Sequence, residues 1–215
     1  MSETSGPPRD RGSWDSRYVD GFLPWDTGRA DAHLLRVVEE RGIRPGRAVE
    51  LGCGTGTNSI WLAQQGFDMT GLDLAPTAVQ RARAKAEAAG VACEFVNADI
   101  LNDPLPAGPF DFAYDRGCLH TFALDSERTL FVEHLAAMLA PGALWHSLIG
   151  STDGPPRESG PPRRSAAQIA SAVEPHFEIL ELRSTSFDSE RHAEARAWVL
   201  VARRRGNDAF DAGAA

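Results

Sequence analysis

The sequence predicts an α/β fold in which helices cover both faces of a mainly parallel β-sheet. Three observations support this class. Strand-like and helix-like segments alternate along most of the chain, and helical crossovers are typical of parallel sheets. The first strand-like segment runs into a glycine-rich turn over residues 52–56. Two strand-like segments end the chain without a helix between them, which predicts a terminal antiparallel hairpin.

The size and composition of the chain suit one globular domain with a full core. It has 215 residues, of which 42% are hydrophobic and 24% are charged. Residues 1–12 and 206–215 carry no periodic apolar pattern, so we expect two flexible ends. The single domain is therefore expected over residues 13–205.

The elements can be placed from local signals. Residues 30–41 put apolar side chains on one helical face, and Gly42 ends that helix. Pro76 opens a later helix at its first turn. Residues 154–164 hold four prolines and two glycines, which predicts a loop or a lid. The expected strands are residues 47–51, 68–73, 93–96, 110–115, 143–149, 177–182 and 197–202, and the further helices are residues 58–65, 76–89, 126–139 and 166–173.

Several partners and compartments are not expected. The formal net charge of -8 argues against nucleic acid, which needs clustered Lys and Arg. The three cysteines lack the spacing of a zinc site and fit a reducing compartment, so we expect no metal. No secretory leader and no membrane span is indicated. We expect a cytoplasmic monomer or homodimer that acts on a small molecule.

The glycine turn and two acids predict a ligand site. Residues 52–56 read Gly-Cys-Gly-Thr-Gly, whereas a dinucleotide fingerprint needs a glycine where Thr57 stands. Asp73 and Asp99 follow the next two strands, at the carboxyl ends where open α/β sheets bind ligands. Each acid alone is more often a helix cap or a loop residue. Together they favour a ligand that lacks a pyrophosphate.

This pattern resembles the class I S-adenosylmethionine-dependent methyltransferases. The resemblance is carried by the run Glu50-Leu51-Gly52-Cys53-Gly54-Thr55-Gly56 together with Asp73 and Asp99. It implies a Rossmann-like, doubly wound sheet of seven strands, with the glycines against the methionine portion of the cofactor. Asp73 would bind the ribose, and Asp99 the adenine end. The cofactor-binding residues so implied are Glu50, Gly52, Gly54, Asp73, Leu74, Asp99, Ile100 and Asp115.

A closer resemblance points to the thiopurine methyltransferase-like group, which includes thiol, halide and tellurite methyltransferases. It is carried by residues 14–21, by Pro24-Trp25-Asp26 and by residues 110–117, and then by Glu190-Arg191-His192. Residues 13–44 would form a helical and aromatic cap before a core over residues 45–205. The resemblance implies that Trp14 and Trp25 cover the cofactor and that Arg116 lines the active site.

The chemistry of the acceptor is open at this point. Arg116 could hold an anionic acceptor, or it could form an ion pair with a nearby acid. His120 could serve as a general base for a hydroxyl or an amine, or it could be packed. The leading prediction is methyl transfer to a thiol or another soft nucleophile. The alternatives are O- or N-methylation with His120 as base, a nicotinamide-dependent oxidoreductase, and a non-catalytic cofactor-binding module.

Overall fold

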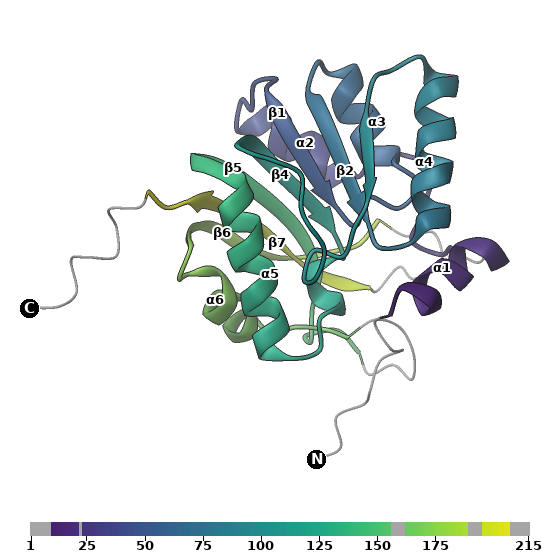
Figure 1. Ribbon diagram of the computed structural model, residues 1–215. Coiled ribbons are helices and arrows are strands. Elements are labelled where there is room, and N and C mark those ends of the chain that lie inside the picture. The colour runs from purple at the N-terminus through teal and green to yellow at the C-terminus, as the bar shows by residue number, and fades with distance from the viewer. Residues whose placement is uncertain (1–9, 22, 156–161, 189–194, 207–215) are drawn as a thin grey trace, which may run out of the picture.

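Seven strands form one sheet in the computed structural model, which describes residues 10–21, 23–155, 162–188 and 195–206 (Figure 1). Their order across the sheet is β3-β2-β1-β4-β5-β7-β6, and this confirms the predicted fold class. The strands are β1 (Arg47–Leu51), β2 (Asp68–Asp73), β3 (Glu94–Asn97), β4 (Phe110–Arg116), β5 (Leu139–Gly150), β6 (Phe177–Ser186) and β7 (Arg196–Arg204).

The first five strands run parallel, and β7 lies antiparallel between β5 and β6. Leu51 pairs with Leu72 on one side and with Asp115 on the other, so the carboxyl ends of β1, β2 and β4 meet at one edge. The chain leaves β1 toward β2 on one side and reaches β4 on the other. Such a reversal of strand order is where open α/β sheets bind ligands.

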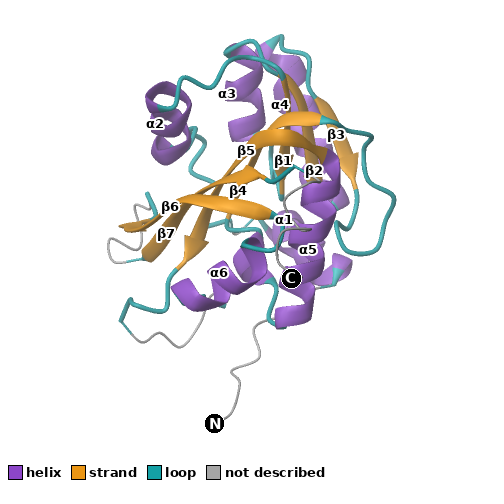
Figure 2. Cartoon of the chain, turned by 90° about the vertical axis from the view of Figure 1, so that its left-hand side faces the viewer, coloured by secondary structure: helices purple, strands orange, loops and turns teal. Residues whose placement is uncertain are grey.

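Helices cover both faces of this sheet, as Figures 1 and 2 show. One apolar cluster joins the sheet to α5 and α6 through Phe131, Trp145 and Ile169, all fully buried. A second cluster on the opposite face joins it to α2 and α3 through Leu34 and Leu62. The helices are α1 (Arg11–Asp20), α2 (Ala32–Glu40), α3 (Thr57–Gln64), α4 (Pro76–Ala89), α5 (Asp125–Met138) and α6 (Ala166–Val173), with a short 3-10 helix η1 (Leu119–Thr121).

The amino-terminal boundary of the cap differs from the predicted one. Residues 10–12 were expected to be flexible, but α1 begins at Arg11. The Asp10 side chain caps it by accepting a hydrogen bond from the backbone N–H of Ser13 at 2.7 Å. Gly21 ends α1 in the left-handed conformation, with φ of 77°. The predicted flexible segments 1–9 and 207–215 lie outside the described residues.

The carboxyl-terminal hairpin is longer than predicted. β6 continues to Ser186, opposite Arg196 of β7. Its last four residues, 183–186, are polar, so the apolar pattern of the sequence does not reveal that the strand continues. The backbone of these residues still pairs with β7. The 154–164 loop returns at Arg164, which bridges to Ser151, and residues 156–161 lie outside the described residues. Among the described helices, none combines the length and apolar character of a membrane span.

Candidate active site

The glycine turn after β1 lies at the meeting point of the strand ends. The backbone N–H of Cys53 donates to the carbonyl of Leu72 at 2.8 Å, which fixes the turn to the end of β2. Gly52 and Gly54 have φ of 67° and 55°, which side chains rarely adopt. A Cβ at Gly54 would come within 3.1 Å of the Tyr18 hydroxyl. The turn therefore requires glycine because of its left-handed backbone conformation and because the Tyr18 hydroxyl lies close to Gly54.

Asp73 ends β2 directly beside this turn. Its Oδ2 accepts from the backbone N–H of Gly54 at 2.8 Å, and its Oδ1 from that of Ala75 at 2.9 Å. Burial raises the pKa of this carboxyl from 3.8 to about 6, although the hydrogen bonds from Ala75 and Gly54 oppose the shift. The backbone of Leu74 also bonds to this carboxylate, so Asp73 is held by backbone donors on both sides. Leu74, which follows, is half-buried.

Glu50 lies beneath the turn and is 1% exposed. Its carboxylate accepts from Asn58 Nδ2 at 3.0 Å and from the Ser59 hydroxyl, which tie β1 to the first turn of α3. Burial raises the pKa of Glu50 from 4.5 to about 7, against these hydrogen bonds. The structure thus places Glu50 as a support of the glycine turn.

An aromatic trio from the cap, Trp14, Tyr18 and Trp25, lies beside the turn. The Trp14 and Trp25 rings meet edge to face with centroids 5.8 Å apart, and Tyr18 meets Trp25 in the same way at 6.2 Å. Tyr18 is buried and packs against Ala75 and Ala78 at the start of α4. Its pKa is raised, mainly by burial. The two tryptophans singled out in the sequence therefore lie together, and Tyr18 links them to the glycine turn.

Polar contacts connect residues 11–26 of the cap to the segments that follow β1, β2 and β3. α1 lies beside α4 at the edge of the sheet (Figure 1). The contacts run from Arg11 to Asn97 and Asp103, from the Thr77 N–H to Asp15 at 2.7 Å, and from the Thr55 hydroxyl to Asp26 at 2.6 Å.

The turn after β3 carries the other predicted acid. Asp99 Oδ1 accepts from the backbone N–H of Leu101 at 2.9 Å, and its Oδ2 accepts from Asn102 Nδ2 at 2.9 Å. Ile100 is buried beside it. Sequence reasoning missed Asn97, whose side-chain amide donates to the backbone carbonyls of Asp73 and Leu74 and holds the ends of β2 and β3 together.

Asp115 is fully buried and organises the loop after β4. Its Oδ1 accepts from the backbone N–H groups of Cys118 and Leu119 at 3.1 Å, and its Oδ2 accepts from the Trp145 indole at 3.0 Å. Burial raises its pKa from 3.8 to about 6. The loop so held brings Cys118 against Gly52, where a Cβ would meet the cysteine sulfur at 3.1 Å. A cofactor contact by Asp115 itself stays a prediction.

Arg116 forms the ion pair that was weighed against a substrate role. Its Nε donates to Asp31 Oδ2 at 2.7 Å, and its two terminal nitrogens donate to the carbonyls of Trp25 and Asp188 at 3.1 Å each. The guanidinium also stacks over the Phe187 ring at 5.3 Å. Three of the five N–H groups of the guanidinium thus bond to other parts of the chain. Asp31 was not singled out in the sequence, where its only signal is its position before α2.

His120 is packed between the ends of β4 and β5. Its Nδ1 accepts the backbone N–H of Gly150 at 2.7 Å. A Cβ at Gly117 or at Gly150 would come within 3.1 or 3.0 Å of the ring, so both positions need glycine. Since a backbone N–H can only donate, the neutral ring carries its proton on Nε2. Arg191 and His192 lie outside the described residues.

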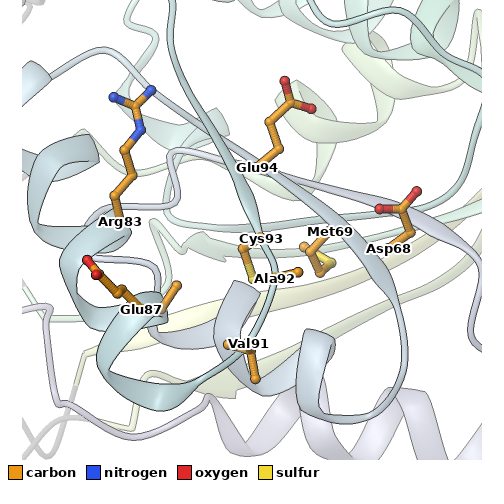
Figure 3. Close-up of a pocket in the computed structure, with 9 residues that line it drawn as sticks. Asp68, Met69, Arg83, Glu87, Val91, Ala92, Cys93 and Glu94 are labelled. Carbon is orange, nitrogen blue, oxygen red and sulfur yellow. The ribbon is translucent and has the colours of Figure 1, made fainter.

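A surface hollow of about 470 Å³ lies elsewhere, at the amino ends of β2 and β3 (Figure 3). Asp68, Arg83, Glu87 and Glu94 line it together with Cys93. It is at the opposite edge of the sheet from the glycine turn, so none of the predicted site residues reaches it. Within the described part of the chain, no cluster of His, Cys, Asp or Glu could hold a metal ion.

Comparisons with known proteins agree with this geometry. A family model described as a methyltransferase domain matches residues 48–142. A probable thiol methyltransferase 2 from Arabidopsis thaliana is 31% identical over 167 residues, which cover 75% of this chain and 69% of the relative. A 2-heptyl-1-hydroxyquinolin-4(1H)-one methyltransferase from Mycobacteroides abscessus is 28% identical over 158 residues, or 73% of this chain and 69% of the relative.

Solved structures extend the similarity to nearly the whole chain. A structure from work on the conversion of a disulfide bond into a thioacetal group during echinomycin biosynthesis aligns with a TM-score of 0.80 at 27% identity, and 93% of each chain is covered. Other solved structures of the same fold are methyltransferases with bound S-adenosylmethionine or S-adenosylhomocysteine. The chain belongs to the class I S-adenosylmethionine-dependent methyltransferases and, within them, resembles the thiol methyltransferase group.

Proposed function

We propose that the protein transfers the methyl group of S-adenosylmethionine to the sulfur of a small thiol, or to a similarly soft nucleophile. The observation that carries this proposal is the hydrogen bond from Gly150 to His120 Nδ1. It leaves the neutral ring protonated on Nε2, so His120 has no basic nitrogen to take a proton from a hydroxyl or an amine. A thiol needs no such base, because an ordinary thiol pKa of about 8.5 leaves some thiolate near neutral pH.

The residues at the strand ends fit the cofactor. Asp73 presents a carboxylate beside the glycine turn, and carboxylate oxygens can accept hydrogen bonds from ribose hydroxyls. Gly52 and Gly54 would lie against the methionine portion, and Asp99 and Ile100 against the adenine. When bound, S-adenosylmethionine supplies an electrophilic methyl group on a sulfonium.

The cap would contribute orientation and the exclusion of water. Trp14, Tyr18 and Trp25 present aromatic surface above the glycine turn. A thiolate that accepts a methyl group from a sulfonium neutralises both charges, so a dry and weakly polar surrounding favours the transfer. Cys118, at the same edge, would line the acceptor side of the site.

O-methylation of a small hydroxyl compound is the second candidate. The similarity to the hydroxyquinolinone methyltransferase from Mycobacteroides abscessus favours it. An acceptor whose hydroxyl ionises by itself would also need no base. The two candidates therefore differ in the atom that receives the methyl group.

The test is a labelled-methyl assay with benzenethiol, phenol and aniline, which share one ring and differ in the accepting atom. We expect methyl phenyl sulfide to form in equal amount with S-adenosylhomocysteine, and the other two acceptors to give little product. Asp73→Ala should weaken S-adenosylhomocysteine binding by about ten- to a hundredfold, since the ribose loses a charged acceptor. Methylated phenol or aniline as the main product would refute the thiol assignment, and unchanged affinity in Asp73→Ala would refute the ribose contact.

A further inference from the structure

Arg116 joins three parts of the chain at the carboxyl edge of the sheet. It is the last residue of β4 and donates to Asp31 just before α2, to the carbonyl of Trp25 in the cap, and to the carbonyl of Asp188 after β6. The side chains of Arg116 and Asp31 are only 14% and 1% exposed. Solvent therefore screens this ion pair little, in contrast to the ion pairs on the surface.

Asp31 continues this connection toward the glycine turn. Its backbone N–H donates to Asn58 Oδ1 at 2.9 Å, and Asn58 Nδ2 donates to Glu50 at 3.0 Å. Its Oδ1 accepts from the N–H groups of His33 and Leu34 and caps α2, while Oδ2 takes Arg116. One buried acid thus connects the support of the glycine turn with the arginine that holds the Trp25 backbone.

The position of Trp25 depends on this connection. The indole packs against Trp14 and Tyr18 over the glycine turn, and its carbonyl is a partner of Arg116. If Asp31 loses its charge, the guanidinium loses the one carboxylate that it contacts within the described part of the chain, and its hold on the Trp25 backbone weakens. The aromatic cover would then open more often.

We propose that Asp31 is a positioning residue that, by holding Arg116, keeps the aromatic cap closed and sets how long the cofactor stays bound. This role rests on the proposed function, because it needs S-adenosylmethionine or S-adenosylhomocysteine at the glycine turn. It assigns Arg116 to the same task, in place of a contact with the acceptor. A closed state that is less populated binds its ligand more weakly in direct proportion.

The experiment follows the release of tritiated S-adenosylhomocysteine from the full-length protein after a chase with unlabelled ligand. Asp31→Asn is the main variant, because its amide oxygen can still cap α2 while the charge opposite Arg116 is lost. We expect its release rate constant to rise at least tenfold. Arg116→Lys, which cannot reach Asp31 and both carbonyls at once, should give a rise of similar size. The double variant should release no faster than the faster single variant, because both changes break one contact.

Glu181→Gln is the matched control. Glu181 pairs with Arg41 at the same 2.7 Å distance, but this pair is about one-third exposed and contacts neither the aromatic trio nor the glycine turn. Its loss should leave the release rate unchanged. A lower melting temperature of Asp31→Asn with an unchanged release rate would overturn the proposal, since Asp31 would then be a structural brace. A wild-type protein that does not bind S-adenosylhomocysteine would instead overturn the proposed function, and this inference with it.

Discussion

Gly150 donates its backbone N–H to Nδ1 of His120 at 2.7 Å. The bond joins the end of β5 to η1, and the ring fills the space that the missing side chains of Gly117 and Gly150 leave. His120 is 5% exposed and meets Phe187 edge to face. The histidine is therefore packed between the ends of β4 and β5, and the Gly150 N–H sets the tautomer of its neutral ring.

Replacing His120 with asparagine separates a structural role from a catalytic one. The asparagine Oδ1 can accept the Gly150 N–H, as Nδ1 does, but it cannot act as a base. We expect kcat/KM for benzenethiol to fall by less than about tenfold, whereas loss of a general base would cost about a hundredfold or more. His120→Ala is the contrast: it leaves the buried N–H of Gly150 without its partner and should lower the free energy of unfolding by about 1–3 kcal/mol. A hundredfold loss in a folded His120→Asn protein with normal cofactor affinity would restore the base hypothesis.

The buried Glu50 predicts an unusual dependence of stability on pH. Its pKa is raised from 4.5 to about 7 in the folded chain, mainly by burial, so the folded state binds this proton more tightly than the unfolded state does. The resulting stabilisation is complete below about pH 4.5 and is lost as the pH rises through about 7. Glu50→Gln keeps hydrogen-bond partners for Asn58 and Ser59 without titrating. Urea denaturation of both proteins at pH 5 and pH 8 should show wild type losing up to about 3 kcal/mol relative to Glu50→Gln. A difference that is constant, or that grows in favour of wild type with pH, would contradict this account.

Two truncations test the cap. Removing residues 1–9 leaves Asp10, which caps α1, and Arg11, which contacts Asn97. Turnover of this variant should match that of the full chain. Removing residues 1–26 deletes the aromatic trio, and we expect turnover to fall by about a hundredfold, the scale of a misplaced or wet reaction centre. Equal turnover of the two truncated proteins would mean that the trio is not a cover.

The reactivity of the cysteines toward an alkylating reagent can show where the cofactor binds. Cys118 lies partly exposed against Gly52, Cys93 lines the hollow at the opposite edge, and Cys53 is buried. S-adenosylhomocysteine at one hundred times its Kd should slow alkylation of Cys118 by iodoacetamide by up to about a hundredfold. Cys93 should react at the same rate with and without ligand, as an internal control. Peptide mass spectrometry that finds both cysteines protected, or neither, would place the ligand elsewhere.

The elements with strong local signals were predictable from the sequence. β2 and α4 have the predicted bounds, because Pro76 and Gly90 mark the helix and Gly66 comes just before the strand. The start of β5 was harder to predict from the sequence. The strand begins at Leu139, four residues before the predicted start, because Leu139 pairs with Phe110 across the sheet. That pairing is a tertiary contact, and Pro141-Gly142 reads locally as a turn.

The same limit applies to the site. The glycine turn and Asp73 form a local pattern, and the structure brings them together as predicted. The ion pair of Asp31 with Arg116 joins residues 85 positions apart, and nothing near either residue signals the other. An ion pair of Arg116 was among the sequence interpretations, but its partner was not. Burial decides such partners, and burial follows from the assembled fold.

The rate of methyl transfer as a function of pH, measured with two thiols of different acidity, tests the central claim most directly. If the acceptor enters as its own thiolate, kcat/KM rises with pH along the titration of each thiol, near about 8.5 for an ordinary thiol and lower for a more acidic one. The midpoint should therefore move with the acceptor, and His120→Asn should leave it in place. A midpoint that stays near about 6.5 for both thiols, and that disappears in His120→Asn, would show an enzymic histidine base and contradict the account.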